Sequence, residues 1–137
     1  MARVRIYDVQ TLNWKKGADL VDADMLSTLN QEERSMEVRY HEPGGDDRPQ
    51  LFEARFPANM VVELHAHHED EIIYVQSGFM KLGQRLLGPG SSLYVGGDTL
   101  YTFTAGGEGL HILNFRPRRD DSYLKKDAFL SYRATAH

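Results

Sequence analysis

The chain contains no cysteine, and this absence removes several kinds of chemistry at once. Without thiols there are no disulfides, no cysteine nucleophile and no thiolate metal site. Any metal ion would therefore have to be bound by nitrogen and oxygen ligands, such as imidazole and carboxylate groups.

The sequence also lacks long apolar runs and a strong excess of charge. No stretch approaches the roughly 20 apolar residues of a membrane-spanning helix, and the N-terminal MARVRIYDVQ has no apolar core of signal-peptide length. The formal net charge of -4 gives no general attraction to nucleic acid or to an anionic membrane surface. We therefore expect a cytoplasmic protein whose partner is a small molecule, with neither nucleic acid nor membrane involved.

What is present is a series of short apolar runs separated by turn residues. The 137 residues fit one domain, and from Ser35 onward runs rich in Val, Ile, Tyr, Phe and Leu alternate with Gly, Pro, Asn and Asp. No helical pattern separates these runs, so they indicate an antiparallel barrel or sandwich and not a βαβ fold. About eight such strands predict an all-β jelly-roll barrel, which hides its strand edges.

This barrel is expected to lie between two less regular segments. Residues 1–34 form a polar N-terminal arm, with one short helix expected between Asp22 and Glu33. Residues 35–117 form the barrel, and residues 118–137 form a C-terminal tail that packs on the barrel or on a partner subunit.

A dense group of metal-ligand side chains lies in HAHHEDEIIYVQSG, residues 65–78. Side chains alternate faces along a strand, so His65 and His67 point the same way, and a turn after them starts a new strand at Glu71. In an antiparallel pair, a residue just past the turn can lie beside residues just before it. Two histidines and one carboxylate with open positions are typical of non-haem Fe(II) oxygen chemistry, and they also suit Mn(II), Ni(II) or Zn(II).

An H-x-H pattern alone is more often an exposed polar turn than a metal site. Here Glu71 follows His67 by four residues and Gly78 follows Glu71 by seven, and this joint spacing favours a metal site. The spacing resembles the first motif of the cupin superfamily, H-x-H-x(3-4)-E-x(6)-G, at every defined position. One departure precedes it, because the glycine usually found six residues before the first histidine is here Asn59.

A second stretch, LGPGSSLYVGGDTLYTFTA at residues 87–105, is similar to the second cupin motif but departs from it at most positions. That motif reads G-x(5)-P-x-G-x(2)-H-x(3)-N, and Gly90 aligns with its first glycine. The remaining positions are filled by Gly96 for the proline, Asp98 for the second glycine, Tyr101 for the histidine and Ala105 for the asparagine. The resemblance covers roughly residues 35–117.

Tyr101 stands where the family has its third histidine ligand, and this leaves three interpretations open. Tyr101 binds the metal as a phenolate or lies nearby and hydrogen-bonds a substrate as a catalytic residue. Alternatively, His111 supplies the missing nitrogen. A two- or four-residue turn around Gly106 and Gly107 points His111 outward, and a loop one residue longer or shorter points it inward. In the third interpretation, the site has lost its metal.

Other residues near these motifs have simpler expected roles. Three core residues are expected to line the substrate pocket beside the site: Phe103, Ile73 and Tyr94. The basic stretch that begins at Arg116 and runs into Asp120 is expected to be solvated and self-neutralising.

The resemblance implies a small metal-dependent enzyme with one divalent transition metal, Fe(II) first and Mn, Ni or Zn as alternatives. A dioxygenase acting on a small organic molecule is the leading interpretation, and isomerase, cyclase or lyase chemistry is also compatible with it. The alternative is a non-catalytic cupin that binds or senses a small molecule through a decayed metal site. The family further implies a homodimer in which the arm or the tail crosses between subunits.

Overall fold

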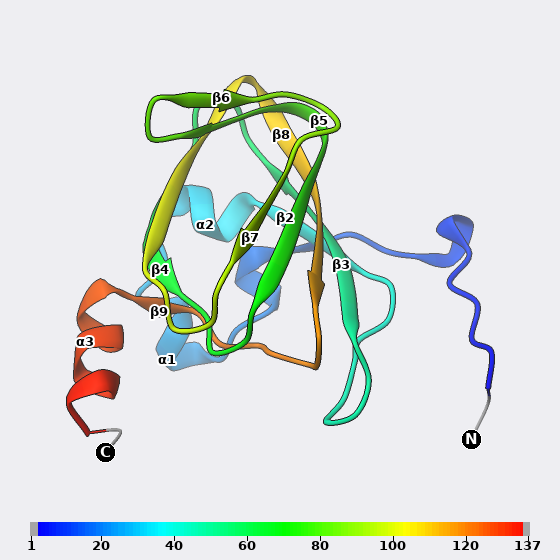
Figure 1. Ribbon diagram of the computed structural model, residues 1–137, viewed down its shortest axis with the longest axis horizontal. Coiled ribbons are helices and arrows are strands. Elements are labelled where there is room, and N and C mark those ends of the chain that lie inside the picture. The colour runs from blue at the N-terminus through cyan, green and yellow to red at the C-terminus, as the bar shows by residue number, and fades with distance from the viewer. Residues whose placement is uncertain (1–2, 136–137) are drawn as a thin grey trace.

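The strands form where the apolar runs lie, and they build an antiparallel jelly-roll barrel (Figure 1). The computed structural model describes residues 3–135. Its strands are β1 (Lys15–Lys16), β2 (Glu37–Tyr40), β3 (Gln50–Phe56), β4 (Val61–Ala66), β5 (Glu71–Leu82), β6 (Arg85–Leu87), β7 (Ser92–Val95), β8 (Tyr101–Arg116) and β9 (Leu124–Lys125). The hydrogen-bonded order β1-β2-β3-β8-β4-β9 is joined by β5, which pairs with β6, β7 and β8.

Strand β8 organises the barrel because it is long enough to pair with three others. Its second half pairs with β3 on one edge and with the first half of β5 on the other. Its first half pairs with β4 and with the end of β5. The inward side chains of these strands form the apolar core: Val38, Phe52, Ala54, Met60, Val62, Ile73, Val75, Met80, Phe103, Ala105, Leu110 and Ile112.

Two glycine-containing breaks that suggest turns in the sequence are continuous strand in the structure. No hairpin forms around Gly106 and Gly107, because β8 runs straight through them. Instead the inward-facing parity switches there, from odd positions such as Phe103 to even positions such as Ile112. Strand β5 does the same at Gly78, where the ladder shifts register and φ is +74°. A β-bulge changes which side chains face inward without reversing the chain.

Asn59 and Asp98 each stand where the cupin motifs have a glycine, and both lie in the left-handed region of the backbone. Asn59 has φ of +63° and Asp98 has φ of +56°, and they are the only non-glycine residues with positive φ in the described part of the chain. Asn and Asp tolerate this region better than other side chains do. The two substitutions therefore preserve the backbone turns that glycine usually makes.

Short helical segments cover one open side of the barrel. The N-terminal segment contains η1 (Val9–Thr11), η2 (Gly17–Asp19), α1 (Ala23–Leu26) and α2 (Gln31–Ser35), in place of the single helix expected between Asp22 and Glu33. Asn30 and Glu33 form a capping box that starts α2. At the other end, α3 (Lys126–Thr135) packs against β4 and β9 through the buried Phe129. Within residues 3–135 no helix has the length and apolar character needed to cross a membrane.

Candidate functional site

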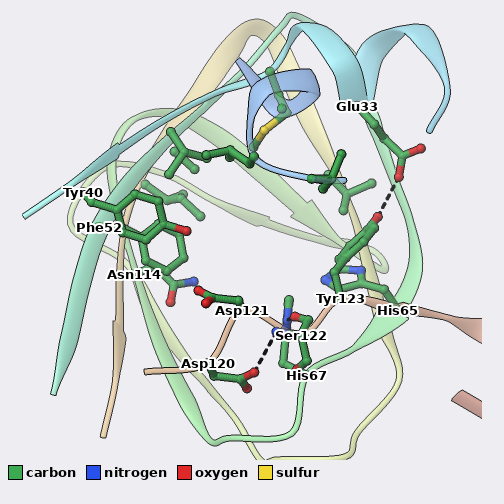
Figure 2. Close-up of a pocket in the computed structure, with 18 of the residues that line it drawn as sticks. Glu33, Tyr40, Phe52, His65, His67, Asn114, Asp120, Asp121, Ser122 and Tyr123 are labelled. Carbon is green, nitrogen blue, oxygen red and sulfur yellow. Dashed lines mark hydrogen bonds between the residues drawn. The ribbon is translucent and has the colours of Figure 1, made fainter. Parts of the chain in front are cut away.

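A cavity of about 630 Å³ lies inside the barrel, with apolar walls and one polar end. Ile73 and Phe103, both expected in the pocket, line its wall. The polar end contains His65, near the end of β4, and His67, which directly follows that strand (Figure 2). The wall is completed by α2, through Glu33, and by the segment at 119–123 that follows β8.

Each of the two histidines is held in one orientation by a backbone carbonyl. Nδ1 of His65 lies 2.7 Å from the carbonyl oxygen of Glu63, and Nδ1 of His67 contacts the carbonyl oxygen of Ser122. A carbonyl oxygen only accepts, so each Nδ1 carries the proton and each Nε2 keeps a lone pair. Such bonds fix the tautomer and leave Nε2 free to accept a proton or bind an ion.

Burial keeps both imidazoles neutral. His65 is 3% exposed, and burial, reinforced by neighbouring His67, lowers its pKa to about 4. Burial also lowers the pKa of His67, and the charge of Arg116 lowers it further. At neutral pH the site therefore contains two uncharged nitrogen bases.

Glu71 begins β5 beside these histidines and carries a full set of hydrogen bonds. Its Oε1 accepts from the hydroxyl of Tyr101 at 2.5 Å, and its Oε2 accepts from Nδ2 of Asn114 at 3.0 Å. Oε2 also accepts from Nε and Nη2 of Arg116, at 3.3 and 3.2 Å. Burial raises the pKa of Glu71, but nearby His67 and Arg116 and the hydrogen bonds outweigh burial and lower it. The carboxylate is therefore ionised, and its charge is balanced by a guanidinium group.

Tyr101 is a hydrogen-bond donor here and not a phenolate. Burial, together with the adjacent carboxylate of Glu71, raises the pKa of its phenol well above the usual value. Its ring lies 4.5 Å from that of His65, centroid to centroid. The side chain at the third-histidine position thus holds Glu71 in place through its hydroxyl proton.

The expected metal ligands come together, but they do not form a metal-binding set. Nε2 of His67 is 3.9 Å from Oε1 of Glu71, and the two imidazole centroids are 5.0 Å apart. Among residues 3–135, however, no three His, Asp or Glu side chains are arranged to hold a metal ion. The imidazoles suit a metal, whereas the carboxylate is already neutralised by Arg116. As arranged here, the three residues do not fit a resident divalent ion.

Two residues expected at the site lie elsewhere. His111 points away from the cavity because the glycine segment of β8 switches the inward parity before it. Its Nε2 lies 2.8 Å from Glu53 Oε1 on the outer face, so it does not supply a fourth ligand. Tyr94, expected in the pocket, is 66% exposed, because its neighbour Val95 takes the inward position opposite Glu71.

Several residues of the polar end are not apparent from the motifs. Arg116, expected in a solvated stretch, is 5% exposed, and Asp120 is also buried. The alternation Leu110, Ile112 continues to Asn114 and Arg116, and this period of two is the sequence signal that places both inward.

The C-terminal segment also contributes to the wall, as Figure 2 shows. Tyr123 lies beside His65 with ring centroids 4.9 Å apart, and its hydroxyl donates to Glu33 at 2.8 Å. The backbone N–H of Ser122 donates to Oδ1 of Asp120 at 2.8 Å. No periodic pattern in the sequence marks these three positions.

Comparison with known proteins finds solved structures with a similar fold. No protein-family model matches the chain, and no curated protein matches its sequence. An RmlC-like cupin from Ralstonia eutropha superposes with a TM-score of 0.65 at 16% identity, covering 98% of this chain and 89% of that one. KdgF from Halomonas gives a TM-score of 0.61 at 21% identity, with 86% and 97% covered. Bacillus subtilis oxalate decarboxylase, which has Mn(II) centres, gives 0.59 at 17% identity, with 71% and 30% covered.

These likenesses concern architecture, since identities of 16–21% are too low to transfer an activity. They agree with the strand order and with the intact first motif, which places His65, His67 and Glu71 at one end of the barrel cavity. The protein therefore has the jelly-roll fold of the cupins.

Proposed function

We propose that the protein is an enzyme that binds a small, neutral organic molecule in the barrel cavity and transfers a proton at His67. The observation that carries this proposal is the pair of contacts made by that imidazole. Nδ1–H donates to the carbonyl of Ser122, and Nε2 lies 3.9 Å from the carboxylate of Glu71. A neutral, oriented imidazole next to an ionised carboxylate is the arrangement expected of a general base.

Each neighbouring group has a role in this transfer. His67 accepts a proton from the substrate at Nε2, and the resulting imidazolium is stabilised by Glu71 and by the carbonyl of Ser122. Arg116 and Tyr101 donate to Glu71 and keep it ionised. Tyr101 therefore positions the carboxylate instead of giving its own proton to the substrate.

The polar end also indicates which molecules it accepts. Oδ1 of Asn114 is buried and has no hydrogen-bond partner in the described part of the chain, while its amide nitrogen is bound to Glu71. The two histidine Nε2 atoms are further acceptors. Since the charges of Glu71 and Arg116 cancel, a neutral ligand with hydroxyl groups on an apolar frame complements this end. Hydroxy ketones, enolised β-diketones and phenols meet this description.

Proton transfer can be tested without knowing the physiological substrate. Chelator-treated protein is screened against these compound classes by thermal shift, and stabilising carbonyl compounds are then incubated with protein in D2O. We expect deuterium to replace the hydrogen next to the carbonyl, as followed by proton NMR. His67→Gln should slow this exchange by on the order of 100-fold or more, because the general base is lost.

His68→Gln is the matched control, since His68 lies next in the chain but is partly exposed and contacts Asp98. It should exchange at the wild-type rate. Binding without any exchange across the panel would instead identify a non-catalytic binding module and overturn the enzyme proposal.

An iron-dependent dioxygenase is the second candidate, and one observation favours it. Both histidines direct an unprotonated Nε2 toward the site, as metal-binding histidines do. This candidate requires Glu71 to exchange Arg116 for a metal ion. Elemental analysis of protein purified without chelator, followed by oxygen uptake with phenols, decides between the two. About one iron per chain with dioxygen consumption would favour the dioxygenase.

A further inference from the structure

The guanidinium of Arg116 lies in the polar end of the cavity, where hydrogen bonds and an aromatic ring contact it. Nε and Nη2 both donate to Oε2 of Glu71, at 3.3 and 3.2 Å, and Nη1 donates to the backbone carbonyl of Asp120. Its Cζ also lies 5.1 Å from the ring centroid of Phe52. Because all three nitrogens of this buried arginine donate hydrogen bonds, its side chain is held in one position within the site.

This guanidinium already supplies the positive charge that Glu71 requires. The guanidinium is a permanent cation, and its Nη2 lies 3.2 Å from Oε2 of this carboxylate. A divalent ion bound between Glu71 and the two neutral histidines would be placed next to Arg116 in a poorly solvated site. Like charges repel strongly there, and each of them also loses hydration.

The other oxygen of Glu71 is also occupied. The hydroxyl of Tyr101 donates to Oε1 at 2.5 Å, so this oxygen already accepts a hydrogen bond within the protein. The carboxylate therefore has no oxygen without a donor, although both imidazoles are oriented as metal ligands.

We propose that Arg116 excludes divalent metal ions from this site by occupying the carboxylate that an ion would need. The sequence retains the first-motif residues His65, His67 and Glu71, and Arg116 pairs with the last of them at 3.2 Å. This inference does not depend on proton transfer by His67, because metal binding is measured without turnover.

The test is titration of chelator-treated protein with Mn(II), with metal content measured by elemental analysis after dialysis. Wild-type protein should retain well below one Mn(II) per chain. Arg116→Met should bind about one per chain, because the substitution removes the like charge and frees Oε2 of Glu71 for the ion. Wild-type protein that binds one equivalent as tightly as the variant would overturn the proposal.

Three variants make the result specific. Arg116→Lys keeps the positive charge and should still exclude the ion, and Arg118→Met, at an exposed neighbour, should leave metal content unchanged. Adding His65→Ala to Arg116→Met should remove the gained ion. If the gain persists in that double variant, the ion binds elsewhere and the proposal is wrong.

A further variant keeps the test decisive even if Arg116→Met does not fold. Tyr101→His restores the family's third nitrogen ligand but leaves Arg116 on Glu71. We expect it to bind Mn(II) no better than wild type. Stoichiometric binding by Tyr101→His would show that the missing histidine, and not Arg116, keeps the ion out.

Discussion

His65 makes the stability of the protein depend on pH, because it is buried as a neutral base. Its pKa is about 4 in the folded protein and near 6.5 when unfolded, so the unfolded chain binds a proton first as pH falls. The full stability is present above pH 6.5 and declines as pH falls toward 4. Between about pH 7.5 and pH 5 we expect a loss of roughly 2 kcal/mol in the free energy of unfolding.

Urea unfolding at the two pH values measures this loss, and His65→Gln provides the comparison. The variant cannot gain a proton at this position, so its stability should change less over the same range. An equal loss in the variant would assign the pH dependence to other groups.

At the scale of single residues, the sequence predicted which motif side chains lie close together better than it predicted which charged residues are buried around them. Parity and spacing bring His65, His67 and Glu71 to one end of the barrel, because a strand period of two and one tight turn determine that geometry. The burial of Arg116 could not be predicted from its neighbours, because the charged residues that follow it indicate solvent exposure. Its burial depends on β8 continuing past Phe115, which is a property of the whole barrel.

At the scale of elements, the glycines within and between the strands differ in whether a larger side chain would fit in their place. Gly78 has φ of +74°, and a Cβ there would lie 2.1 Å from the carbonyl oxygen of Gly109. Gly83 has φ of +60°, but a Cβ there would meet nothing within 4 Å. This pair separates backbone strain from steric collision.

We expect Gly83→Ala to cost about 1 kcal/mol in the free energy of unfolding, since only the left-handed backbone is disfavoured. Gly78→Ala should cost several times more, roughly 3 kcal/mol or more, because β5 and β8 must also separate. Chemical denaturation of both variants measures the difference. Similar losses would mean that the bulge at Gly78 relaxes easily.

The same bulges explain which elements the sequence did not predict. A glycine pair between two apolar runs is the signature of a hairpin, and Gly106 and Gly107 fit it. In β8 and β5 the long-range pairing partners keep the chain extended through the glycines, and this information lies far away in the sequence. By contrast, the limits of β3 (Gln50–Phe56) are visible in the sequence, because Pro49 and Pro57 stand directly on either side of it.

At the scale of the whole molecule, one outer face of the barrel is unusually apolar. Ile72, Tyr94 and Phe115 form a row across three paired strands, and Tyr74 lies next to them. All four are exposed, and on β5 they alternate with buried apolar residues, so this sheet is apolar on both faces. An exposed apolar row of this kind is typical of a protein interface.

We expect the chain to form a homodimer through this row, as measured by light scattering coupled to size-exclusion chromatography. Ile72→Asp and Phe115→Asp should shift the mass to that of a monomer, because a buried unpaired carboxylate opposes association. Leu86→Asp changes a still more exposed apolar residue, on β6, and should leave the dimer intact. A monomeric wild-type protein would contradict this expectation.

One of the contacts between the N-terminal arm and the barrel is made by an aromatic side chain. Trp14, the single tryptophan of the chain, lies under the guanidinium of Arg55, 3.6 Å from ring centroid to Cζ, and beside Arg39 at 4.4 Å. Both arginines belong to the outer face, while the neighbouring Val38 and Ala54 face the cavity. The intrinsic fluorescence of the protein is thus an optical reporter of whether the arm stays docked, and a molecule that enters the barrel has no direct contact with that chromophore.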